Sequence, residues 1–318
     1  MVPRRDARFT HMGDPAAFFR DVERVAFWRE LVPWLHVEQS RPPPRPPAAP
    51  DAAAQDDHGR ADGWTRAGHV VLRSVLPSAM TSPLARAISA LGAAGVHPTF
   101  VYVYDETWQV IEALRPWLAP LLGEDHDVLA DAWAFLVDPR VDRGGWPIHR
   151  GWYEDVRDAT GSPGLANVWV ALTEATTRNA CMHVVPLSRD PHYPHDLRNL
   201  AGLDDLGVAL PVPAGSALVW SANVAHWGGR CDAGFDQPRV SVTFTVRRRG
   251  FAVEAASVRQ PLTFRERLDL VAAQLVTYGD AELGAERAEM RWASMIAGIA
   301  GIADMARATA RGRGQKPY

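Results

Sequence analysis

Short apolar runs separated by turn residues fill the middle of the chain and limit its fold more than any other feature. The runs are 132–137, 168–172, 183–185, 217–220 and 240–246. Strands at this density, without helical segments between them, predict an antiparallel barrel or sandwich and not a doubly wound parallel sheet. We therefore expect a mainly β core with flanking helices, an α+β arrangement.

Helical periodicity flanks this core on both sides. Residues 83–94 and 106–122 precede it, whereas residues 99–104 are β-branched and aromatic and predict a further strand. Residues 70–72 open the globular part. Residues 264–278 and 284–309 follow it with apolar stripes. The last segment is too polar to span a bilayer, so we expect it to pack on the core or to form an oligomer contact, with a homodimer that assembles through the C-terminal helices.

Composition divides the chain into four parts. Residues 1–39 form an N-terminal helical arm, with Asp14 as a cap and Pro15 at the first helical position. Residues 40–63 are rich in Pro, Ala, Asp and Arg and predict a disordered linker. Residues 64–251 form the core with its preceding helices, and residues 252–318 form C-terminal helices.

Charge and cysteine content exclude several classes of function. A net charge of -3 over 318 residues gives no electrostatic reason to expect nucleic acid or an anionic membrane as partner. Cys181 and Cys231 are the only cysteines, which argues against a disulfide scaffold or a thiolate zinc site. No segment reaches the roughly 20 apolar residues of a membrane span, and we expect a cytoplasmic protein.

Two histidines and an arginine form the pattern with chemical meaning. His149 follows the first core run, and His226 and Arg239 lie far downstream. Two imidazoles can bind a nonheme Fe(II), while an arginine binds the distal carboxylate of an organic acid that chelates the iron. Lys316 is the only lysine, so a buried cation in the core must be an arginine. Residues i and i+2 of a strand face the same way, so a second ligand beside His149 belongs at position 151, which is glycine.

Residues 64–251 resemble the phytanoyl-CoA dioxygenase-like branch of the Fe(II)/2-oxoglutarate oxygenases, chiefly in the segments 168–176 and 179–186. The resemblance implies a double-stranded β-helix core, the jelly-roll or cupin-like fold. It implies iron at His149 and His226, dioxygen as a cosubstrate, and 2-oxoglutarate salt-bridged by Arg239 with Ser241 and Trp169 nearby.

Gly151 departs from that family pattern, because most relatives have aspartate at this position. Within the superfamily, glycine or alanine there is typical of nonheme iron halogenases. Loss of the carboxylate leaves one ligand position and one negative charge to be filled, and a chloride or bromide ion supplies both. We therefore expect a halogenase that acts on a small molecule, either free or tethered to a carrier.

Two alternatives remain open. The chain can be an Fe(II)/2-oxoglutarate-dependent hydroxylase whose third ligand is Glu154 or Asp155, or a non-catalytic binding protein on the same fold. Candidate residues of the substrate pocket are Trp146, Trp152, Asn179 and Trp227. A second cluster at residues 192–195, with Asp190, suggests a metal at first sight, but its prolines indicate an exposed loop, which could be part of a lid.

Overall fold

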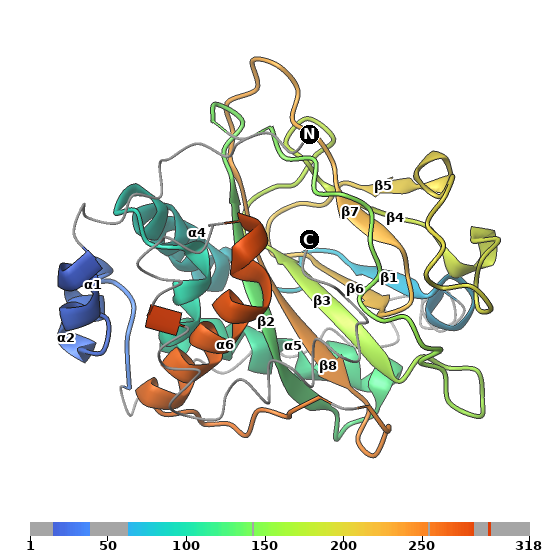
Figure 1. Cartoon of the computed structure of the whole chain (residues 1–318), viewed down its shortest axis with the longest axis horizontal. Helices are drawn as coiled ribbons and strands as arrows, with labels where there is room; N and C mark the ends of the chain where they lie inside the picture. Colours follow the sequence, from blue (N-terminus) through green and yellow to red (C-terminus); the bar gives the residue numbers. More distant parts are fainter. Residues whose placement is uncertain (1–14, 39–62, 142, 254, 283–291, 294–318) are drawn as a thin grey trace.

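Two antiparallel sheets form the centre of the molecule (Figure 1). The computed structural model describes residues 15–38, 63–141, 143–253, 255–282 and 292–293. The larger sheet has the order β1-β6-β3-β8-β2, and the smaller has the order β5-β4-β7. The strands of the larger sheet are β1 (His69–Leu72), β2 (Asp127–Val137), β3 (Leu165–Ala171), β6 (Ala217–Ser221) and β8 (Arg239–Arg247). Those of the smaller sheet are β4 (Met182–Val184), β5 (Val208–Leu210) and β7 (His226–Gly228).

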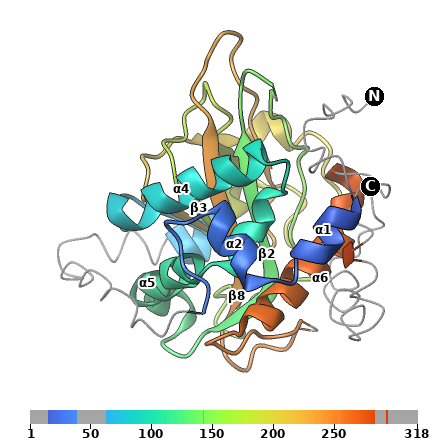
Figure 2. The same cartoon turned by 90° about the vertical axis from the view of Figure 1, so that its left-hand side faces the viewer.

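Helices cover the outer face of the larger sheet (Figure 2). They are α1 (Pro15–Asp21), α2 (Val25–Leu31), α4 (Ser78–Ala93), α5 (Asp105–Leu122) and α6 (Phe264–Glu282). Ile88 of α4 and Val271 of α6 pack with Val168 of β3 and Val242 of β8 in one hydrophobic cluster. All residues of β3 are buried because one face meets these helices and the other faces the interior between the sheets. The expected β core with flanking helices is confirmed.

Four short helices complete the described structure. They are η2 (Gly63–Ala67), η3 (Pro98–Val103), η4 (Leu187–Arg189) and η5 (Asp204–Leu206). The element η3 lies where residues 99–104 predicted a strand, so that prediction is wrong. Pro98 stands at the start of η3, and the His97 imidazole accepts a hydrogen bond from the Thr99 amide at 3.2 Å, which caps a helical turn. Every side chain of η3 is buried, and a short apolar run that is buried on all sides has no periodicity to distinguish a strand from a helix.

The other predicted elements that lie among the described residues are confirmed within a few residues at their ends, while β5 and β7 were not predicted. Both are three-residue strands, too short for an alternating pattern to appear. Asp14, the linker residues 39–62 and most of the predicted helix 284–309 lie outside the described residues. Among the described residues, no helix is both long and apolar enough to cross a membrane.

Candidate metal and cosubstrate site

His149 and His226 lie directly opposite each other at the edge of the smaller sheet. The two residues form an antiparallel bridge, in which each backbone amide donates to the other residue's carbonyl at 3.0 and 2.9 Å. Their imidazole ring centroids are 4.2 Å apart. Residues separated by 77 positions in the sequence (226 − 149) thus place two imidazoles side by side.

The backbone selects the tautomer of both imidazoles. Nδ1 of His149 is 2.9 Å from the carbonyl oxygen of Pro147, and Nδ1 of His226 is 2.9 Å from that of Val224. A carbonyl oxygen only accepts, so Nδ1 holds the proton and Nε2 has the lone pair. An imidazole oriented in this way by its other nitrogen is the usual form of a metal ligand. The donor set fits a divalent transition metal.

Neither carboxylate considered as a third ligand lies with this pair. Glu154 and Asp155 are both exposed. Asp155 forms an ion pair with Arg157 at 2.6 Å; burial raises the pKa of its carboxyl, but the hydrogen bonds from Arg157 outweigh this effect and lower that pKa. In the part of the chain that the structure describes, no three His, Cys, Asp or Glu side chains form a group suited to a metal ion.

The cluster at residues 192–195 is also directed elsewhere. Nε2 of His192 is 3.2 Å from the carbonyl oxygen of Ala201, within its own loop. His195 is exposed, and Asp190 is fully buried against Arg150 at 2.6 Å. The structure therefore assigns Asp190 to an ion pair and does not group it with the two histidines of this loop.

Arg239 and Ser241 extend from β8 into the interior of the core. Both are buried, and Nη1 of Arg239 donates to Oγ of Ser241 at 3.1 Å. The Arg239 guanidinium lies 5.5 Å from the ring centre of Trp169 and 5.8 Å from that of Phe135. Nε1 of Trp169 is buried and has no hydrogen-bond partner among the described residues. A buried cation beside such an unused donor is suited to a carboxylate.

Arg239 and the two histidines open onto the same interior. Gly228 lies two residues after His226 on β7 and therefore on the same face. A Cβ atom at Gly228 would lie 3.9 Å from Nη2 of Arg239 and 3.5 Å from Cβ of Trp146. The Trp146 ring in turn lies 6.5 Å from the His149 ring, centre to centre. The structure thus brings His149, His226, Arg239 and Trp146 around one space.

The other expected pocket residues have different surroundings. Trp227 alternates with His226 on β7, and its ring stacks on His183 at 5.2 Å, on the opposite face of the strand. Asn179 accepts from the Thr176 amide at 2.6 Å and donates to the Glu174 carbonyl at 3.0 Å, so it stabilises its own turn. Trp152 packs in a separate apolar cluster with Leu129, Val156, Leu165 and Ala222. Of the four, only Trp146 contacts the histidine pair.

The sequence model of the phytanoyl-CoA dioxygenase (PhyH) family matches residues 129–233, the segment that includes both histidines and Gly151. This part of the chain is similar to that family. The resemblance indicated by the sequence is confirmed, and the match supports an enzyme of the Fe(II)/2-oxoglutarate-dependent oxygenase family. None of the curated proteins matches the chain significantly.

Solved structures agree with the family match. The chain is similar to the non-heme alpha ketoglutarate dependent epimerase SnoN from nogalamycin biosynthesis, with 18% identity and a TM-score of 0.50 over 67% of this chain and 87% of SnoN. It is also similar to the non-heme monooxygenase ThoJ in its apo form, with 20% identity and a TM-score of 0.50 over 80% of this chain and 99% of ThoJ. SnoN has in addition been solved in complex with Fe3+, alpha ketoglutarate and nogalamycin RO. These similarities confirm the jelly-roll fold of the core.

Sequence reasoning missed the residues that fix the two histidine segments of the core relative to each other. Arg150 is fully buried between His149 and Gly151, donates to the carbonyls of Leu197 at 2.9 Å and Asn223 at 2.5 Å, and pairs with Asp190. Asn223 donates to the Trp152 and Glu154 carbonyls at 3.1 and 2.7 Å. An arginine next to a candidate ligand was a visible signal, but its partner Asp190 lies 40 positions away (190 − 150) and could not be identified.

The Arg150–Asp190 pair leads to a stability prediction. Arg150→Met leaves the buried Asp190 carboxylate without its partner, and we expect the free energy of unfolding to fall by about 3–5 kcal/mol. Arg157→Met is a matched control, because it removes an Arg–Asp pair with the same 2.6 Å separation at the surface; its cost should stay below about 1 kcal/mol. Denaturant unfolding measures both, and equal losses would contradict an anchoring role for Arg150.

Proposed function

We propose that this chain is an Fe(II)/2-oxoglutarate-dependent enzyme in which His149 and His226 bind the iron and Arg239 binds 2-oxoglutarate. The observation that supports this best is the bridged histidine pair, with both Nδ1 atoms next to backbone carbonyls, in the same interior as a buried arginine. The PhyH match over this segment agrees with the proposal.

The chain's own residues have separate roles in this proposal. Bound Fe(II) would supply the site for dioxygen activation, with 2-oxoglutarate as the source of two electrons and succinate and carbon dioxide as its products. His149 and His226 hold the metal through Nε2. Arg239 neutralises and orients the distal carboxylate, Ser241 holds the guanidinium by accepting from it, and Nε1 of Trp169 is available as a further donor. Burial strengthens each of these charge-assisted contacts.

We propose halogenation of an aliphatic carbon as the reaction, because position 151 supplies no carboxylate. In the overall reaction a C–H bond and a halide give a carbon–halogen bond, and one oxygen atom of dioxygen leaves as water. Hydroxylation by the same site is the second candidate, favoured by the family match. A non-catalytic binding protein on the same fold is the third. The substrate in either catalytic case is a small molecule, free or tethered to a carrier.

Succinate formation tests the proposal without a known substrate. We expect the protein with Fe(II), 2-oxoglutarate and dioxygen to form succinate slowly, and omission of any one of the three to stop it. Substitution of chloride by a non-coordinating anion should change the rate if the halide occupies the site, and should leave it unchanged for a hydroxylase. A protein that binds iron and 2-oxoglutarate but forms no succinate, alone or with candidate substrates, would support the binding-protein alternative.

A further inference from the structure

The space beside Gly151 is taken by another residue. A Cβ atom at position 151 would lie 2.7 Å from Nδ2 of Asn167 and 3.4 Å from the Ala222 carbonyl oxygen. A separation under 3.0 Å is a steric clash, so a side chain at position 151 and the present Asn167 carboxamide exclude each other. Gly151 and Asn167 therefore form a complementary pair.

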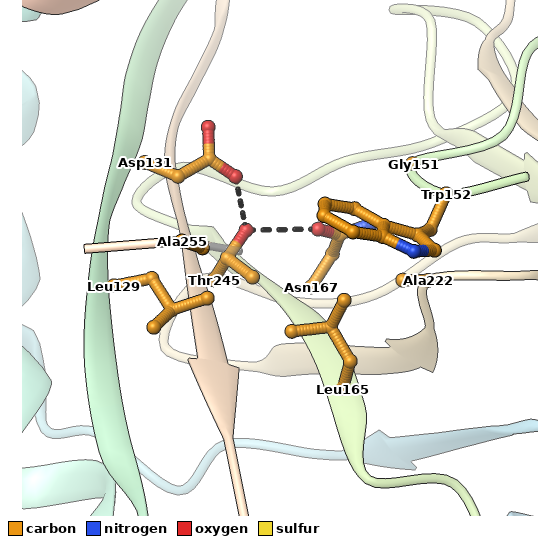
Figure 3. Close-up of a pocket in the computed structure, with 9 residues that line it drawn as sticks. All are labelled: Leu129, Asp131, Gly151, Trp152, Leu165, Asn167, Ala222, Thr245 and Ala255. Carbon is orange, nitrogen blue, oxygen red and sulfur yellow. Dashed lines mark hydrogen bonds between the residues drawn. The ribbon is translucent and has the colours of Figure 1, made fainter. Parts of the chain in front are cut away.

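Asn167 is held by a row of polar side chains across the interior of the larger sheet (Figure 3). Oδ1 of Asn167 accepts from the Thr245 hydroxyl at 3.0 Å. The same hydroxyl contacts the Asp131 carboxylate, which also accepts from the Tyr278 hydroxyl at 3.0 Å. The Thr245 hydroxyl has one proton and serves one of its two neighbours at a time. With Oδ1 facing Thr245, the amide nitrogen of Asn167 faces Gly151.

That amide nitrogen has no acceptor among the described residues. Asn167 is 8% exposed and lines a small cavity of about 10 Å³. Gly151, Trp152 and Ala222 line the same cavity (Figure 3). A buried donor without a protein acceptor needs a water or an anion as its partner.

Two neighbours of Asn167, Gly151 and Trp220, connect it to the histidine segments. Gly151 is two residues from His149, and Trp220, the partner of Asn167 in the β3–β6 register, has its ring centre 4.7 Å from that of His226. The expected aspartate of the family would extend from position 151 into the space that Asn167 now contacts. The Asn167 carboxamide thus occupies the space in which an aspartate side chain at position 151 would begin.

We propose that Asn167 replaces the side chain that position 151 lacks. Its carboxamide excludes a carboxylate from this position, and its N–H group donates to the small anion that takes the carboxylate's place at the metal. This inference deepens the proposed function and rests on it, because the anion is the halide of that reaction. A neutral donor stabilises a bound anion, whereas a second carboxylate would repel it.

The steric half of the proposal can be tested on the metal-free protein. We expect Gly151→Ala to lower the melting temperature by roughly 4 °C when Asn167 is present, as overpacking does. In an Asn167→Ala background the same Gly151→Ala change should cost less than about 1 °C, because the contact is gone. An equal loss in both backgrounds would overturn the pairing of Gly151 with Asn167.

The contact between position 151 and Asn167 also determines how well the protein tolerates an aspartate introduced at position 151. Gly151→Asp alone should be destabilised by Asn167, whereas Gly151→Asp combined with Asn167→Ala gives the new carboxylate room. The double variant should therefore melt at a higher temperature than Gly151→Asp alone. A double variant that melts lower would contradict the proposal.

The chemical half is tested by chloride titration of the anaerobic complex with Fe(II) and 2-oxoglutarate. We expect chloride to shift the visible spectrum of the wild type, and Asn167→Leu, which has similar volume but no donor, to weaken the apparent chloride affinity by about tenfold or more. Asn199→Leu, the same change in the loop between η4 and η5, is the control and should leave the affinity within twofold.

The possible outcomes separate the two proposals. If the wild type binds no iron, the proposed function fails, while the melting experiment still decides the steric pairing. If iron and 2-oxoglutarate bind but chloride does not, or binds Asn167→Leu as tightly as or more tightly than the wild type, the role of Asn167 as anion donor is overturned and the iron site stands.

Discussion

His226→Ala and His149→Ala should each abolish stoichiometric Fe(II) binding. The proposed site has two protein nitrogen ligands, and loss of either would leave a single imidazole, so we expect the metal affinity to fall by more than about 100-fold. The bridge between the two residues uses backbone atoms and remains after either substitution. Equilibrium dialysis under anaerobic conditions, with metal analysis, measures the effect.

Two further histidines provide matched controls. His183→Ala changes an imidazole on the neighbouring strand β4 that stacks on Trp227, and His195→Ala changes an exposed imidazole of the loop at residues 192–195. Both variants should bind one equivalent of Fe(II). Iron binding that survives His226→Ala but is lost in His195→Ala would move the metal to the loop and refute the site.

Arg239→Leu should raise the apparent requirement for 2-oxoglutarate by about two orders of magnitude, since a hydrogen bond to a charged group contributes roughly 1.5–3 kcal/mol. Arg239 is 4% exposed and lies against two aromatic rings, where solvent screens its charge little. Leucine fills much of the space without replacing the charge.

The control for this prediction is Arg249→Leu, which changes an exposed arginine just after β8. It should leave the 2-oxoglutarate dependence within error. The dissociation constant of 2-oxoglutarate, measured anaerobically with Fe(II) present, separates the two variants. A change of less than twofold in Arg239→Leu would mean that the distal carboxylate is bound by another residue.

The sequence predicts the β core well because a strand that is buried on both faces is apolar along its whole length. In β3, Val168 packs beneath the helices and Trp169 faces the interior, so the whole strand is apolar. Periodicity fails for residues 99–104, which are apolar for the same reason but form the 3-10 helix η3. The composition of a run that is buried on every side indicates that the segment is buried, but it does not distinguish a strand from a helix.

The sequence predicts which residues form the candidate site but not how their side chains are arranged. The sequence singled out His149, Gly151, His226 and Arg239, and the structure brings the histidines and the arginine around one space. The pairing of Gly151 with Asn167 could not be read from the sequence, because it depends on the register of β3 against β6 and β8. Trp227 and Asn179 were expected in the substrate pocket, and in the structure they contact His183 and their own turn; position in the chain alone does not determine the direction of a side chain.

Calorimetric titration of the wild-type protein with 2-oxoglutarate, in the presence and absence of Fe(II) and without oxygen, tests the central claim most directly. Because 2-oxoglutarate would chelate the metal and contact Arg239 at the same time, the account predicts one tight binding event per chain with Fe(II) and much weaker binding without it. Binding that is equally tight without metal, or no binding with one equivalent of Fe(II) present, would contradict an Fe(II)/2-oxoglutarate site built on His149, His226 and Arg239.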